Sequence, residues 1–71
     1  MMNPIEIKKG DTVEIASSGL VVKGVVVTVD YWDNDGWDIE LTDANVSGGY
    51  SRWKQWQDGG KVLSVNGEKI Q

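Results

Sequence analysis

The sequence predicts an all-β protein, a single small antiparallel barrel of about five strands with one short helical turn before the last strand. Valine is the dominant apolar residue and phenylalanine is absent, which favours strands. Nine glycines punctuate the chain at short intervals, and apolar residues alternate with polar ones at a period of two. Residues 1–71 are expected to form one domain without a linker or repeat.

The first strand is predicted in DTVEIAS, where Val13 and Ile15 alternate with outward-facing polar residues. Gly10 before the strand and Ser17-Ser18-Gly19 at its end supply residues that tight turns require. The strand is therefore bounded on both sides by turn signals.

The longest strand candidate is LVVKGVVVTVDY. Gly24 inside it predicts a bulge or a sharp bend, of the kind that lets one strand of a small barrel serve two sheets. Strict alternation after Gly24 places Val25, Val27, Val29 and Tyr31 on one face, and Val26, Thr28, Asp30 and Trp32 on the other.

The third strand is predicted in GWDIELTD, where Trp37, Ile39 and Leu41 share the core side. Pairing Trp32 with Trp37 would set valines opposite carboxylates and would bury charge or expose the valines. Pairing Tyr31 with Trp37 avoids this conflict.

The second pairing also aligns Val29 with Ile39 and Val27 with Leu41, so that the apolar residues share one face. It leaves a five-residue loop from Trp32 to Gly36, and it places Trp32 on the solvent side. Trp32 then either contacts a partner or lies across the barrel surface and covers Val26 or a neighbouring strand.

A fourth strand is predicted in YSRWKQW, with Trp53 in the core and Tyr50, Arg52 and Lys54 on the opposite face. Trp56 falls past this strand, where a helical turn and an apolar plug over the end of the barrel are expected. KVLSV makes the last strand, and Asn66-Gly67 predicts a two-residue turn that folds EKI back.

These assignments predict a core of inward-facing residues. The members are Val13, Ile15, Val25, Val27, Val29, Trp37, Ile39, Leu41, Trp53, Val62 and Val65.

KKGDTVEI followed by GVVVTVD resembles the opening of SH3-like barrels of the KOW and Tudor kind. The resemblance covers about the first 30 residues, and the basic loop typical of KOW domains is missing, because SSGLVVKG carries one lysine. The resemblance implies the fold, while the partners of these families are unrelated to one another. It also places Tyr31, Trp32 and Trp56 within reach of the surfaces that such barrels use for binding.

Several classes of function are disfavoured by composition. The chain has no cysteine and no histidine, which removes thiolate metal sites and the commonest general base. Serines lack a histidine base and no glycine-rich phosphate loop precedes a helix, so we expect neither an enzyme nor a cofactor. The formal net charge of −4 disfavours nucleic acid as a partner.

Calcium binding is the first alternative for Asp33-Asn34-Asp35-Gly36, which superficially matches part of an EF-hand loop. Setting Gly36 at loop position 6 puts Tyr31 at position 1 and Thr42 at position 12, so both essential ligands fail. No metal site is expected.

We expect a noncatalytic interaction module of phage or plasmid type that binds a protein or peptide through an aromatic and acidic hairpin surface. Two alternatives stay open, a barrel that stacks single-stranded nucleic acid and an acidic inhibitor of a host nucleic-acid-binding enzyme. The N-terminus lacks the apolar run of a signal peptide, so a cytoplasmic monomer or homodimer without membrane contact is expected. The candidate binding residues are Tyr31, Trp32, Asp33, Asp35, Tyr50, Arg52 and Trp56.

Overall fold

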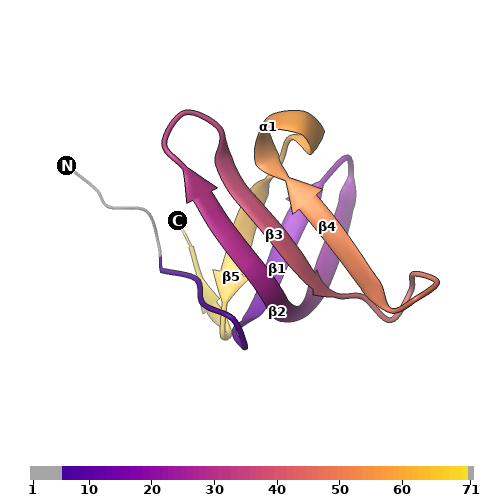
Figure 1. The fold of residues 1–71 in the computed structure, drawn as a ribbon. Helices are drawn as coiled ribbons and strands as arrows, with labels where there is room; N and C mark the ends of the chain where they lie inside the picture. The colour runs from indigo at the N-terminus through magenta and orange to yellow at the C-terminus, as the bar shows by residue number, and fades with distance from the viewer. Residues whose placement is uncertain (1–5, 71) are drawn as a thin grey trace.

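The computed structural model describes residues 6–70, and its strands form an antiparallel sheet in the order β4-β3-β2-β1-β5-β6 (Figure 1). The all-β prediction is confirmed, and one short helix precedes the last two strands. A sixth strand of two residues extends the expected set of about five. The elements are β1 (Thr12–Ser17), β2 (Leu20–Trp32), β3 (Gly36–Thr42), β4 (Tyr50–Lys54), α1 (Gln55–Asp58), β5 (Lys61–Val65) and β6 (Glu68–Lys69).

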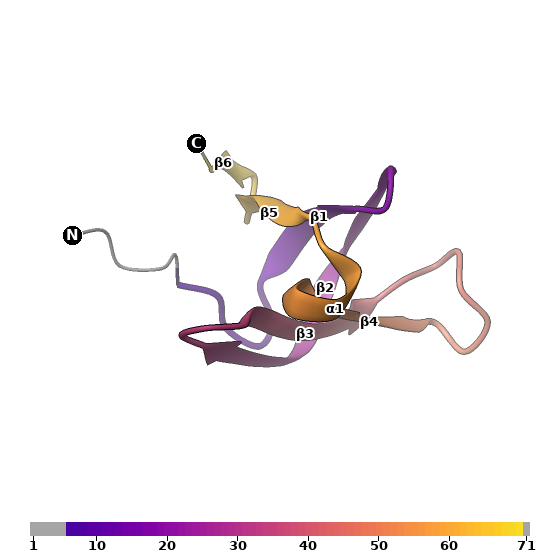
Figure 2. The same cartoon turned by 90° about the horizontal axis from the view of Figure 1, so that it is seen from above.

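Strand β2 belongs to both halves of the curled sheet. Its first half pairs with β1 and its second half pairs with β3, so the sheet folds over into two layers (Figure 2). The change of partner occurs between Val25 and Val26, next to Gly24, where an added Cβ would overlap the backbone carbonyl of Thr42. The next amide, that of Val25, donates to Thr42 Oγ1 at 2.9 Å. The prediction that this strand serves two sheets is therefore confirmed, and close backbone approach explains the glycine.

A β-bulge in β2 corrects the predicted alternation. Leu41 pairs with Val26 instead of the expected Val27, because the β2–β3 register shifts between Val26 and Thr28. The extra residue reverses the phase, so Val26 enters the core and Val25 is 41% exposed. Val27 is only half-buried. The predictions that placed Val25 and Val27 in the core were wrong for this reason.

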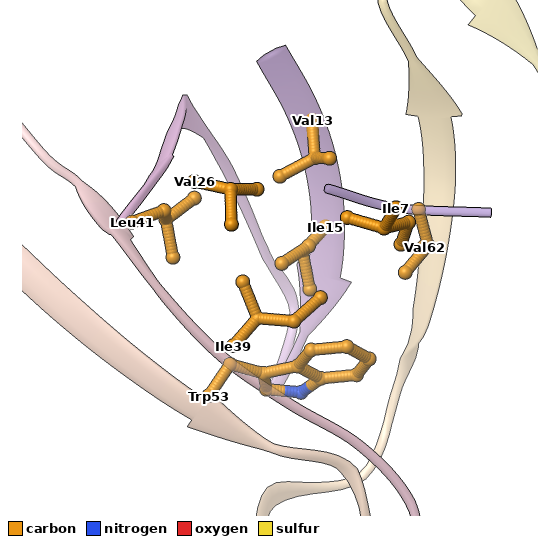
Figure 3. Packing of buried hydrophobic residues seen from close by; sticks show 8 residues of the cluster. All are labelled: Ile7, Val13, Ile15, Val26, Ile39, Leu41, Trp53 and Val62. Atoms are coloured by element: carbon orange, nitrogen blue, oxygen red, sulfur yellow. The ribbon is translucent and has the colours of Figure 1, made fainter. Parts of the chain in front are cut away.

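The core lies between the two layers and is drawn in Figure 3. Its buried members are Ile7, Val13, Ile15, Val26, Ile39, Leu41, Trp53 and Val62. Three expected members, Val29, Trp37 and Val65, are partly buried and pack against this cluster. The indole nitrogen of Trp53 donates to the carbonyl of Gly59 at 2.8 Å, which satisfies the one polar atom of that buried side chain.

The two shortest hairpins have the expected turn residues. Ser18 and Gly19 have φ angles of 54° and 79°, and Asn66 and Gly67 have φ angles of 53° and 84°. Consecutive positive φ values are the mark of the turn whose twist matches that of the flanking strands. The predicted turns at both sites are confirmed.

The sheet keeps two outer edges. Strands β4 and β6 stand at the ends of the strand order, and no strand of residues 6–70 pairs with the outer side of β4. No helix within that range has the length and apolar character that a membrane span requires.

Candidate functional site

The β2–β3 hairpin ends in a tight loop of three residues, Asp33, Asn34 and Asp35. The amide of Asp35 donates to the carbonyl of Trp32 at 3.0 Å, and Gly36 follows with a φ of 92°. The expected five-residue loop was too long, because Trp32 and Gly36 pair with each other and extend the ladder. The tip is therefore a short turn on a regular hairpin.

Strand phase separates the two aromatic residues at the end of β2. Tyr31 pairs with Trp37 as predicted, and their rings meet edge to face with centroids 4.7 Å apart. Trp37 packs against the core from there. Trp32 points to the other side of the sheet and is 51% exposed. Tyr31 and Trp32 therefore lie on opposite faces of the sheet.

The prediction that Trp32 covers Val26 is wrong, and its packing on a neighbouring strand stays a prediction. The bulge turns Val26 into the core, on the side of the strand away from Trp32. Trp32 instead stands opposite Gly36, which offers no side chain to pack against. Its exposure is thus left without an explanation in core packing.

Trp32 lies at one end of a solvent-facing surface that we call the outer face. The outer face is the side of β2, β3 and β4 turned away from the core, and register assigns it Thr28, Asp30, Trp32, Asp38, Glu40, Thr42, Tyr50, Arg52 and Lys54.

One ion pair organises the middle of the outer face. Arg52 Nε donates to Asp38 Oδ1 at 2.9 Å and Arg52 Nη2 donates to Asp38 Oδ2 at 2.7 Å. The hydrogen bonds from Arg52 lower the pKa of Asp38, and the same contact raises the pKa of Arg52. Asp38 is buried beneath this contact, whereas the Arg52 side chain stays 58% exposed. A guanidinium held at two points is fixed in orientation while its surface remains accessible.

The hairpin tip is acidic. Asp30, Asp33 and Asp35 are exposed, and the Arg52–Asp38 contact is the only salt bridge in the described part of the chain. Three carboxylates without an ion-pair partner thus lie around Trp32. They create a local negative field at the end of the molecule.

The remaining predicted site residues, Tyr50 and Trp56, belong to β4 and α1 and not to the β2–β3 hairpin. Tyr50 is exposed on the outer face, but it pairs with Thr42, six residues along β3 from Gly36, which places it roughly 20 Å from Trp32 along the strands. Trp56 lies on α1, which contains no buried residue, so the expected plug over the core was wrong. The predicted residues therefore form no single site.

Sequence reasoning missed Gln55, which ties α1 to the hairpin. Its Oε1 accepts from the backbone amide of Trp37 at 3.2 Å, and its Nε2 donates to the carbonyl of Gly60 at 3.1 Å. The side chain lies against Gly36, where a Cβ would overlap Oε1. Gln55 thus stands beside Trp37 where β4, if it were one residue longer, would pair with it. No sequence motif predicts this role.

A second missed feature is an apolar groove beside β4. Its volume is about 180 Å³, and Leu20, which is 68% exposed, lies on it. The other residues that line it are Ile15, Ser17, Val22, Leu41, Ser51, Arg52, Trp53 and Asp58. In the sequence, Leu20 and Val22 were predicted only as residues of a strand.

Within residues 6–70, no three acidic side chains converge on a point where a metal ion could bind. No protein-family model, curated protein or solved structure matches this chain. The resemblance of its first 30 residues to SH3-like barrels stays a prediction, and the hairpin tip and the outer face carry the functional argument.

Proposed function

We propose that this protein is a noncatalytic interaction module that binds a protein partner through its hairpin tip. The tip surface comprises Asp30, Trp32, Asp33 and Asp35. The observation that carries the proposal is the half-exposed indole of Trp32, surrounded by carboxylates that have no ion-pair partner in the described structure.

The residues of this surface favour a partner that presents basic side chains together with an apolar group for Trp32 to contact. Tryptophan is enriched among the residues that dominate binding energy, because it buries a large area with few rotatable bonds. The exposed aspartates around it attract lysine and arginine side chains and accelerate encounter. An indole face also attracts a cation directly.

The scaffold supports the proposal by holding the tip in place. The edge-to-face contact of Tyr31 and Trp37 anchors the inner side of the hairpin. Gln55 bonds its backbone at Trp37. A surface that is already ordered loses little conformational entropy on binding, so more of the contact energy becomes affinity.

The charges weigh against the nucleic-acid alternative. Base stacking on an aromatic platform needs cations nearby to hold the phosphates. Trp32 has aspartates as its neighbours along the chain, and the outer face carries two cations, of which Arg52 is engaged by Asp38 and Lys54 stands opposite Asp38 on β4. An inhibitor of a nucleic-acid-binding enzyme, encoded by a phage or plasmid, has the same requirement for a basic partner surface and is one form of this proposal.

The proposal is tested by NMR titration with three probes of similar length. These are a lysine- and arginine-rich peptide with a central leucine, its glutamate counterpart, and an oligo-thymidine strand. The basic peptide is expected to shift the indole resonance of Trp32 among the four tryptophans. Trp32→Ala and the double change Asp33→Asn with Asp35→Asn should each weaken binding by at least about tenfold.

Two variants away from the tip serve as controls. Tyr50→Ala removes an exposed aromatic residue at the far end of the outer face, and Glu68→Gln removes a charge from β6. Binding that follows Tyr50 and ignores Trp32 would contradict the proposed surface. Preferential binding of oligo-thymidine, with a steep loss on adding salt, would favour the stacking alternative.

A further inference from the structure

The outer edge of β4 carries backbone groups that no described strand pairs. Residues of an antiparallel strand point their amides and carbonyls alternately to one neighbour and the other. The amides of Trp37 and Asp43 both point toward the β4 side, where they donate to Gln55 Oε1 and to the carbonyl of Gly49. Ile39 and Leu41 therefore also point toward β4, and their partners Trp53 and Ser51 point back at them.

The same alternation directs the backbone of Tyr50, Arg52 and Lys54 outward. One outward bond confirms it, because the amide of Lys54 donates to Asp58 Oδ2 at 3.1 Å. Asp58 thereby caps the end of the edge and blocks an incoming strand there. The amides and carbonyls of Tyr50 and Arg52 are left open, as a two-residue site for an added strand.

We propose that this edge binds a second copy of the chain, so that β4 pairs antiparallel with β4 of the second copy about a two-fold axis at Ser51. Tyr50 then stands opposite Arg52 of the second copy, and Arg52 stands opposite its Tyr50. This register satisfies the open amides and carbonyls of both edges with four backbone hydrogen bonds, and it stops where Asp58 begins. The contact is isologous, so it closes at the dimer.

The side chains suit this register. Both Tyr50–Arg52 pairs lie on the outer face, where Asp38 holds the guanidinium and leaves it 58% exposed for stacking on the tyrosine ring. Ser51, a small residue, occupies the axis. Shifting the register to place Arg52 against Arg52 would oppose like charges, and it would need the amide of Lys54 that Asp58 already occupies.

The position of the groove beside β4 supports the addition of a strand at this edge. Ser51, Arg52 and Trp53 line one side of it, and the exposed Leu20 lies on the other. A strand seated on β4 would cover this opening and shield Leu20 from water. The contact is small, so a weak dimer that forms with rising concentration is expected.

Sedimentation velocity and hydrogen exchange on the intact chain test the dimer across a range of concentrations. Tyr50→Lys sets a cation opposite Arg52 twice in the dimer, whereas Tyr50→Glu sets an anion there. The dissociation constant of the lysine variant should exceed that of the glutamate variant by about tenfold. Trp32→Ala, which changes an aromatic residue at the far end of the outer face, should leave dimerisation unchanged.

Hydrogen exchange follows individual amides, so it distinguishes the formation of the dimer from a loss of folding. The amides of Tyr50 and Arg52 should gain protection as the chain concentration rises, while those of Ser51 and Trp53, which face β3, stay protected throughout. A chain that remains monomeric at millimolar concentration overturns the proposal. So does a dimer with equal affinity in both Tyr50 variants, or protection of Arg52 that is independent of concentration.

Discussion

Both carboxylate oxygens of Asp38 accept hydrogen bonds from one guanidinium, that of Arg52, on the neighbouring strand. The contact joins β3 to β4 across the outer face and buries the carboxylate. It also lowers the pKa of Asp38 below the ordinary value of an aspartate.

The stability of the protein should fall in acid partly through Asp38. Because its folded pKa lies below the free value of 3.8, its contribution is complete above 3.8 and is lost as the pH falls through the folded pKa. Urea unfolding between pH 5 and 2 should show this loss. The variant Arg52→Gln should have a flatter profile, and an unchanged slope would contradict the role of the pair. The pKa of Asp11 is also lowered, and since Arg52→Gln leaves Asp11 intact, the comparison isolates Asp38.

The tryptophans should rank by burial when each is replaced with alanine. Trp53 is 5% exposed and its loss should cost about 3–5 kcal/mol, whereas partly buried Trp37 should cost about 2–3 kcal/mol. Trp32→Ala should change the free energy of unfolding by about 0.5 kcal/mol or less. Chemical denaturation measures all three, and a large loss at Trp32 would show that it packs against the fold.

Replacing Gly24 with alanine should damage the bend of β2. The added Cβ would overlap the Thr42 carbonyl, and neither backbone can yield without opening the β2–β3 pairing. A loss of about 3 kcal/mol or more is expected. Gly48→Ala is the control, because its Cβ meets nothing and its positive φ alone should cost about 1 kcal/mol. Equal losses at the two glycines would refute the close approach.

Gln55→Ala should loosen the tip end of the β2–β3 hairpin. The amide of Trp37 would lose its acceptor, at a cost of about 1–2 kcal/mol, and its hydrogen exchange should accelerate. Gln55→Glu keeps an acceptor and should protect that amide better than alanine does. If the Trp37 amide exchanged equally in both variants, Gln55 would not be its partner in solution.

Much of the fold was predictable where local chemistry decides it. Asn66-Gly67 and Ser18-Gly19 specify their turns, since few other residues adopt consecutive positive φ values. The pairing of Tyr31 with Trp37 followed from keeping carboxylates off the core face. The turns and the strand pairing were both predictable because the alternative backbone conformations or registers would place these residues unfavourably.

The bulge at Val27 was not predictable, because neighbouring valines suit either face and alternation cannot locate an extra residue among them. The same limit affected the site. Whether Trp56 packs or stays exposed depends on where α1 directs it, and Gln55 acts through a tertiary contact that leaves no local pattern. Residues in contact across long stretches of chain are where sequence reasoning failed.

The strand order also has a kinetic consequence. Four of the five strand pairings join elements adjacent in the chain, and only β1 with β5 does not. Of these five pairings, the one that joins Val13 to Val65 closes the longest stretch of chain and therefore carries the largest loop-closure entropy cost. If β5 docks in the rate-limiting step, Val62→Ala should slow refolding in stopped-flow experiments. Destabilising changes in the β2–β3 hairpin should mainly speed unfolding. If the hairpin forms before that step, the same changes should slow refolding as well. The β1–β5 seam would then decide how quickly each new chain becomes the folded protein.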